Sequence, residues 1–126
     1  MENKEVVMYI VLNSSLKMKP GKMCSQTGHA VIESYKRTPK NQIFHRWDSS
    51  GSAKIVYKAD EQTILNLLDK YQQSNNRRRN RSEELPGAFP VFDQGRTQVA
   101  EGSLTAIAFQ LVPKGSIPEL KDLQLM

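Results

Sequence analysis

The segment Val6-Val7-Met8-Tyr9-Ile10-Val11-Leu12 decides the fold class of this chain. Seven consecutive apolar residues, most of them β-branched or aromatic, predict a strand that other elements cover on both faces. We expect this strand to run from Glu5 to Asn13. The apolar run is far shorter than the roughly 20 residues that a membrane-spanning helix needs, so it does not predict a membrane anchor.

The segments that follow alternate between helical and extended patterns. Helical spacing of apolar residues predicts one helix that ends before Pro39 and another that begins after Asp60, which is a good N-cap residue. Strand and helix alternation predicts an α/β fold, a three-layer α/β/α domain with a four-stranded mixed, mostly parallel sheet. The expected helices cover residues 22–37, 41–49, 60–76 and 114–123, and the expected strands cover 5–13, 53–59, 89–92 and 104–112.

Length and composition fit a single domain over residues 1–126 that carries an arginine-rich loop insertion over residues 75–90. Eighteen Lys and Arg against thirteen Asp and Glu give a net charge of +5, which allows a polyanionic partner such as nucleic acid. The single cysteine, Cys24, excludes an internal disulfide framework and a cysteine-based zinc site. With two histidines in the chain, a histidine-rich metal centre is not expected either.

The insertion contains a run of like charges, Arg77-Arg78-Arg79-Asn80-Arg81, and two interpretations of it stay open. Blocks of like charge repel one another and form solvated, extended loops. The same residues could instead bind RNA through its phosphates, without sequence preference.

Polar and charged residues follow the predicted strands at their carboxyl ends, where ligands of open α/β sheets bind. If the strands at 5–13, 53–59 and 89–92 are parallel, these ends converge on one crevice. The sequence therefore predicts a site with several cations and a hydroxyl group around one carboxylate, formed by Lys22, Lys58, Asp93, Arg96 and Thr97.

The first predicted helix carries a narrow polar stripe, because Lys22, Gln26, His29, Glu33 and Lys36 recur at helical spacing. Such a stripe is typical of an ordinary solvated face. It also begins at a residue that emerges from a strand-end loop, so it could equally be part of the site.

Two residues invite a catalytic interpretation. Histidine as a residue type titrates near neutrality, which suits a general base, but at His29 we favour a hydrogen-bonded structural histidine. Cys24 falls on the opposite, apolar side of the helix, which predicts a buried and inert thiol.

Two motifs resemble a known family. Residues 16–30 read LKMKPGKMCSQTGHA and residues 93–103 read DQGRTQVAEGS. They resemble the L-K-M-x-x-G-K-x-x-x-Q-x-x-H-A and D-A-G-R-T-Q-I-A-P-G-S signatures of type 2 peptidyl-tRNA hydrolases. The similarity runs from about Val6 to Leu125, with the motifs in the same order.

The resemblance implies a hydrolase that cleaves the ester between a peptidyl group and the 3′-terminal ribose of tRNA, without a metal or organic cofactor. It further implies a homodimer. The single cysteine and an amino-terminal segment unlike a secretory signal or transit peptide lead us to expect a cytoplasmic protein outside membranes. Asp93 could orient or deprotonate the water, or could be only an ion-pair partner that fixes Lys22 or Arg96. A non-catalytic adaptor that binds RNA or protein on the same fold is the alternative function. The implied catalytic residues are Lys22, Asp93 and Thr97, and the implied substrate-binding residues are Gln26, Lys36, Lys58 and Arg96.

Overall fold

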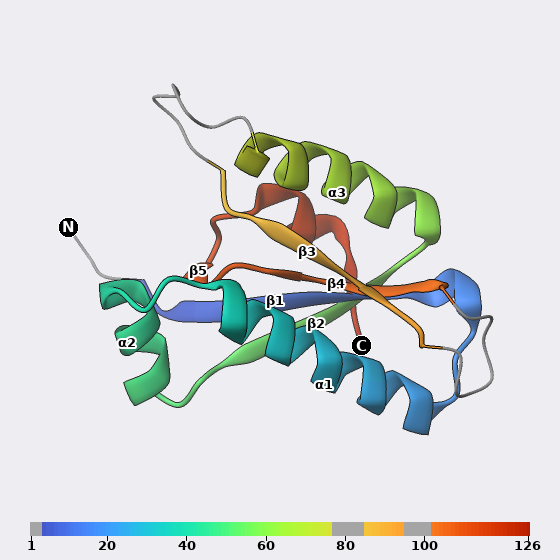
Figure 1. Ribbon diagram of the computed structural model, residues 1–126, viewed down its shortest axis with the longest axis horizontal. Coiled ribbons are helices and arrows are strands. Elements are labelled where there is room, and N and C mark those ends of the chain that lie inside the picture. The colour runs from blue at the N-terminus through green and yellow to red at the C-terminus, as the bar shows by residue number, and fades with distance from the viewer. Residues whose placement is uncertain (1–3, 77–84, 95–101) are drawn as a thin grey trace.

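The computed structural model describes residues 4–76, 85–94 and 102–126 as a layered α/β domain (Figure 1). Most predicted elements lie where the sequence pattern placed them, within a few residues at each end. In chain order they are β1 (Val6–Asn13), the 3-10 helix η1 (Ser14–Leu16), α1 (Pro20–Arg37), α2 (Gln42–Ser49), β2 (Lys54–Ala59), α3 (Glu61–Asn76), β3 (Ala88–Phe92), β4 (Leu104–Phe109), β5 (Val112–Pro113), the 3-10 helix η3 (Pro118–Asp122) and β6 (Gln124–Leu125).

The strands form one mixed sheet in the order β3-β4-β1-β2-β6, and β5 pairs with β1 beside this path. The α/β class is confirmed, but the expectation of a four-stranded and mostly parallel sheet is wrong. The described part of the chain contributes six strands, and β1–β2 is the one parallel pairing among them. The segment between β3 and β4 is too short for the crossover of a dozen or more residues that a parallel return requires, so these neighbours are antiparallel.

The direction of the strands nevertheless confirms that three carboxyl ends meet at one edge. β1 and β2 are parallel, and β4 lies between β1 and β3 and is antiparallel to both. β1, β2 and β3 therefore point the same way. The residues that follow these three strands lie along the same edge of the sheet, as an open α/β site requires.

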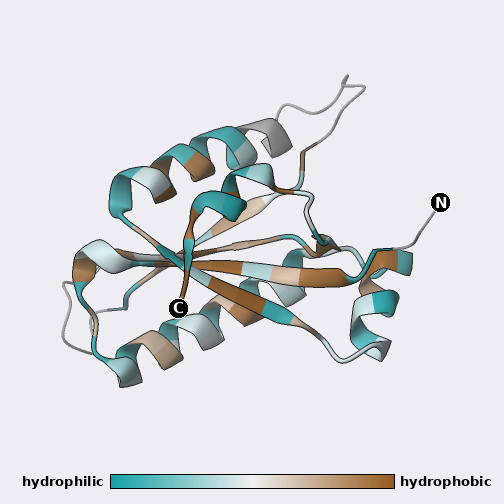
Figure 2. Ribbon diagram, turned by 180° about the vertical axis from the view of Figure 1, so that it is seen from behind, coloured by the Kyte–Doolittle hydropathy of each residue, from teal (hydrophilic) through white to brown (hydrophobic). Residues whose placement is uncertain are grey.

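Helices cover the sheet on both faces, so the three layers are confirmed. All eight residues of β1 are buried. Val7, Tyr9 and Val11 pack with α3 and η3 on one face, whereas the alternate residues of β1 pack with α1 and α2 on the other. Figure 2 shows hydrophobic residues concentrated along the central strands, with hydrophilic residues on the outer turns of the helices.

The C-terminal part differs from the expectation in two places. The strand predicted over 104–112 is divided into β4 and β5, and the helix predicted over 114–123 is the short 3-10 helix η3. Gly115 has φ +90°, a left-handed conformation that interrupts any regular element, and Pro118 begins η3. The residues from Pro118 to the start of β6 at Gln124 can form little more than one helical turn.

Side chains of α3 fix η3 against the rest of the domain. Tyr71 donates its hydroxyl hydrogen to Glu119 Oε1 at 2.6 Å, and Lys70 Nζ donates to Glu119 Oε2 at 2.6 Å. Burial, followed by the hydrogen bond to Glu119, raises the pKa of Tyr71 well above its usual value. Burial alone would raise the pKa of Glu119, but the hydrogen bonds from Lys70 and Tyr71 hold it below its usual value.

Candidate active site

A buried ion pair joins α1 to the end of β3. Lys22 lies in the first turn of α1, where Pro20 begins the helix, and its ammonium group donates to Asp93 Oδ1. The side chains of Lys22 and Asp93 are 4% and 2% exposed. Charges shielded from water in this way interact more strongly with each other, and with any charge that develops between them, than charges at the surface do.

The backbone of Asp93 is held by the strand that follows it. Asp93 N donates to Ser103 O at 2.8 Å, and Gly102 N donates to Asp93 O at 2.9 Å. Gly102 has φ +88°, a conformation in which other residues are strained. These two hydrogen bonds fix the position from which the Asp93 side chain projects toward α1.

A second buried polar contact lies one helical turn along α1. Thr105 donates its hydroxyl hydrogen to Gln26 Oε1 at 2.6 Å, and its oxygen also lies 3.2 Å from Val91 O. Thr105 is the extra residue of a β-bulge in β4, because Val91 pairs with Ala106 while Phe92 pairs with Leu104. A bulge redirects a side chain, and here it directs Thr105 toward the helix. The sequence analysis missed Thr105. The signal that could have indicated it is a polar residue between the apolar strand residues Leu104 and Ala106.

Two of the five residues of the polar stripe on α1, Lys22 and Gln26, are buried against the sheet, so the interpretation as a solvated face is wrong for these two. The buried positions of α1 are Lys22, Gln26, Ala30 and Ser34, at intervals of four residues. Ser34 Oγ donates to Phe109 O at 2.7 Å. Each buried polar side chain of this set thus has a partner across the interface, which is the condition under which burial of polar groups is tolerated.

The rest of the stripe and the expected apolar face behave differently. His29 and Lys36 are exposed, and a hydrogen-bonded structural role for His29 stays a prediction. The prediction that Cys24 is buried is wrong, because this thiol is exposed. The faces were misassigned because the helix turns its polar residues, rather than Cys24, toward β3 and β4.

The structure does not bring all the predicted cations to the ion pair. Lys36 lies fourteen residues after Lys22 on the same helix, about 21 Å along its axis. Lys58 is half-buried on β2. Cross-strand pairs connect it to β3 through Leu12, Ala106 and Val91, so three strand spacings, or about 14 Å in total, separate Lys58 from β3. Lys22, Gln26 and Asp93 are therefore assembled, whereas Lys36 and Lys58 lie apart from them. Thr97, Arg96 and the run from Arg77 to Arg81 lie outside the described residues.

Another buried polar residue, Asn13, ends β1 at the same edge of the sheet. Its Nδ2 donates to Leu104 O at 2.8 Å and to Glu61 Oε1 at 3.1 Å, and its Oδ1 accepts from Ser15 N at 2.9 Å. The sequence analysis assigned no role to Asn13. Asn13 ties three segments of the edge together and orients the Glu61 carboxylate in the first turn of α3.

Asp60 serves as the N-cap of α3, as predicted. Its Oδ1 accepts from Thr63 N at 2.9 Å, and this hydrogen bond lowers the pKa of Asp60. The capping role leaves Asp93 as the carboxylate at this edge that is buried beside a cation.

The described residues lack two features that would point to other kinds of site. No helix in residues 4–76, 85–94 and 102–126 is long and apolar enough to cross a membrane. Within the same ranges no three His, Cys, Asp or Glu residues are grouped so that they could hold a metal ion.

Comparison with known proteins completes the description of the site. The family model described as peptidyl-tRNA hydrolase PTH2 matches residues 6–126. The protein named "Peptidyl-tRNA hydrolase 2, mitochondrial" of Mus musculus is 32% identical over 123 residues, which cover 94% of this chain and 62% of that protein. "Peptidyl-tRNA hydrolase" of Methanocaldococcus jannaschii is 34% identical over 80% of this chain and 82% of its own length. The protein of that name from Methanococcus maripaludis is 33% identical over 93% of this chain and 96% of its own length.

The chain matches less than two thirds of the mammalian relatives, since the alignment with the Bos taurus protein covers 55% of that protein. The archaeal relatives, by contrast, are matched over most of their length.

Proposed function

The chain belongs to the peptidyl-tRNA hydrolase PTH2 family, and on that basis we propose that it hydrolyses the ester between the peptide and the 3′-terminal ribose of peptidyl-tRNA. The observation that carries the proposal is the buried pair of Lys22 and Asp93 at the shared carboxyl edge of the strands. Free tRNA, which can be charged again for translation, and a peptide with a free carboxylate are the products.

The pair supplies two of the groups that ester hydrolysis requires. The Asp93 carboxylate accepts a proton from a water molecule as its oxygen attacks the ester carbonyl carbon. The carbonyl oxygen becomes an oxyanion, which the Lys22 ammonium group stabilises. When the intermediate collapses, the bond to the ribose oxygen breaks, and that oxygen takes up the proton that the water released.

Other residues of the family motifs complete the proposal. Gln26, which is held by Thr105, positions the first turns of α1 beside the substrate. Thr97 holds the attacking water or a ribose hydroxyl in this proposal, and Arg96 binds a phosphate. Lys36 and Lys58 bind phosphates farther from the ester, because they lie about 21 Å along α1 and about 14 Å across the sheet from the pair.

The test is incubation of the purified protein with peptidyl-tRNA, followed by separation of free tRNA. We expect release by the wild-type protein and a loss of about 10²–10³ in rate for Lys22→Ala. Asp93→Ala serves as the second variant, and circular dichroism shows whether each variant is folded. A well-folded wild-type protein that releases no tRNA but still binds it would support the RNA-binding adaptor, which no present observation favours.

A separate variant decides the role of Asp93. Asp93→Asn preserves the shape of the side chain but accepts no proton at neutral pH. We expect turnover to fall sharply if the carboxylate acts on water. Turnover near that of the wild-type protein would mean that Asp93 only fixes Lys22 or Arg96.

The proposal also places the protein in the cytoplasm, as a homodimer. The homodimer comes from the family resemblance, and the cytoplasmic placement comes from cysteine usage and the amino-terminal sequence, so neither rests on the geometry of the site. Analytical ultracentrifugation tests the second, since a monomeric mass at all concentrations would contradict it.

A further inference from the structure

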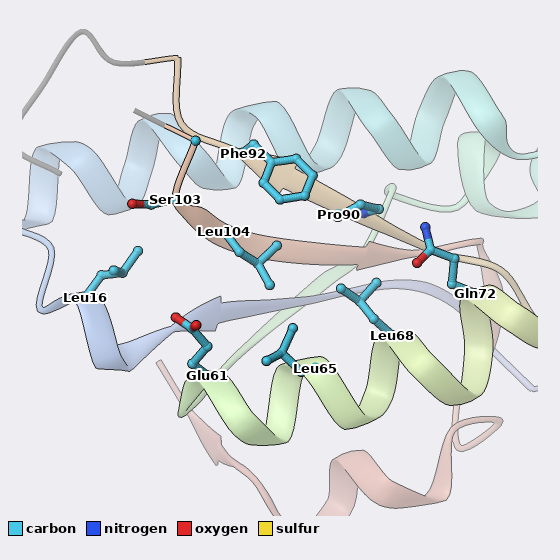
Figure 3. Close-up of a pocket in the computed structure, with 10 residues that line it drawn as sticks. Leu16, Glu61, Leu65, Leu68, Gln72, Pro90, Phe92, Ser103 and Leu104 are labelled. Atoms are coloured by element: carbon cyan, nitrogen blue, oxygen red, sulfur yellow. The ribbon is translucent and has the colours of Figure 1, made fainter. Parts of the chain in front are cut away.

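A cavity lies between α3 and the β3–β4 pair, on the face of the sheet opposite the ion pair. Its volume is about 540 Å³, which is within the usual range for ligand sites. Figure 3 shows side chains of α3 rising toward those of β3 and β4 across this space. The apolar part of the lining consists of Leu16, Leu65, Leu68, Pro90, Phe92 and Leu104.

The cavity and the candidate active site lie on opposite faces of β3 and β4 and share neighbouring residues of these strands. Phe92 precedes Asp93, and because side chains alternate along a strand, Phe92 lines this cavity while Asp93 faces α1. Gly102 and Ser103 form part of the rim, and they are also the residues that hold the backbone of Asp93.

The lining combines exposed apolar surface with polar groups at its two ends. Phe92 is 49% exposed and Leu65 is 42% exposed. A bound molecule would bury this apolar surface. Glu61 and Gln72 lie at opposite ends of the cavity (Figure 3). They are eleven residues apart on α3, so about 16 Å separates them, which is the length of four or five residues of extended chain.

The two sides of β3 differ in chemistry in the same way as the two halves of the substrate. Lys22 and Lys58 face the α1 side. A cavity of about 610 Å³ between α1 and β3 is lined by Lys36 and Arg37, together with Glu33 and apolar residues of β3 that include Phe92. Those cations suit the anionic nucleotide. The apolar cavity on the α3 side suits a neutral peptide.

We propose that the cavity between α3 and the β3–β4 pair binds the peptide half of peptidyl-tRNA in an extended conformation. The side chain next to the ester packs on Phe92 and Leu65, and Glu61, which Asn13 orients, accepts a hydrogen bond from a peptide N–H group. This inference rests on the proposed hydrolase function and adds a preference for apolar residues at the end of the peptide.

The test compares two substrates made on the same tRNA, one with N-acetyl-dileucine and one with N-acetyl-diglycine. We expect the wild-type protein to hydrolyse the leucine substrate with a kcat/KM about tenfold higher, because an apolar pocket typically discriminates by that factor or more. Leu65→Glu places a carboxylate in the cavity and should bring the ratio close to one. Leu125→Glu is the matched control, since Leu125 is 62% exposed on β6 at the other edge of the sheet and should leave the ratio unchanged.

The outcomes separate this inference from the proposed function. Equal rates for the two substrates, or a ratio that Leu65→Glu does not alter, would overturn the peptide cavity while leaving the hydrolase in place. Release from neither substrate would overturn the hydrolase itself. A fall in mass of the Leu65→Glu variant by sedimentation would show that the cavity binds a second copy of the chain instead, which would also overturn the inference. Because Leu65 is exposed on a helix, we expect this variant to melt within a few degrees of the wild-type protein.

Discussion

Substitution of Lys22 by methionine removes the ammonium group from a carboxylate that is only 2% exposed. Methionine matches the length of lysine and has no charge, so the Asp93 carboxylate stays buried without its cation. Removal of one partner from a buried ion pair typically costs about 3–5 kcal/mol in the free energy of unfolding. For a domain of 126 residues, this corresponds to a fall of roughly 10–20 °C in the melting temperature.

The double variant Lys22→Met with Asp93→Leu distinguishes the contribution of the pair to stability from its contribution to chemistry. Replacement of a whole buried ion pair by apolar residues is often neutral or even stabilising. We therefore expect the double variant to recover to within about 1 kcal/mol of the wild-type protein while activity stays abolished.

The free energy of unfolding is measured in urea by circular dichroism for the wild-type protein, Lys22→Met, Asp93→Leu and the double variant. Equal m-values show that the four proteins expose comparable surface on unfolding. The reasoning is refuted if Lys22→Met is as stable as the wild-type protein. A double variant at least as unstable as Lys22→Met would instead show that the pair is kept for stability.

Three further predictions concern other parts of the molecule. Thr105→Val should lower the free energy of unfolding by about 1–3 kcal/mol in urea titrations, because Gln26 Oε1 loses its buried donor, whereas Thr105→Ser should remain close to the wild-type protein. Because the pKa of Glu119 is lower in the folded protein than in the unfolded chain, its contribution to stability is present above about pH 4.5 and is lost as the pH falls through the folded value. Thermal melts between pH 3 and 6 should thus vary less with pH in Glu119→Gln, and an unchanged profile would contradict this. If the arginine run binds tRNA, its replacement by glutamine should reduce the salt dependence of tRNA binding by up to ~0.9 log units for each phosphate that the protein no longer neutralises, and an unchanged slope would favour a solvated loop. The residues replaced are Arg77, Arg78, Arg79 and Arg81.

Local patterns were sufficient for much of the fold. The apolar run of β1, the N-cap at Asp60 and the breaker at Pro39 depend on residues close together in the chain, and the elements they define were confirmed. The number of strands was not predictable in the same way. β5 and β6 have two residues each and exist because β1 and β2 offer them partners.

The candidate site was predicted only in part, because buried and solvated polar residues give the same helical pattern. Gln26 is buried because Thr105, 79 positions later, meets its side chain through a bulge. Lys22 is buried because Asp93 lies 71 positions later and faces it. Neither contact has a local signature, so the spacing of α1 alone placed Cys24 inside and the polar stripe outside. The family motifs pointed to Lys22 and Asp93 independently of that spacing.

The polar contacts between α1 and the sheet also act as a positional reference for the helix. An interface of interchangeable aliphatic side chains can slide or rotate slightly and repack. Lys22 and Ser34 donate hydrogen bonds to the sheet and Gln26 accepts one from it, at regular helical spacing, so all three are satisfied together in one rotation and one translation only. On α1 the buried polar positions therefore tolerate substitution poorly and the exposed apolar positions tolerate it well, which is the opposite of an ordinary amphipathic helix. Its exposed apolar positions such as Ile32 are free to vary, whereas a one-residue insertion between Lys22 and Gln26 would rotate one contact by about 100° relative to the others.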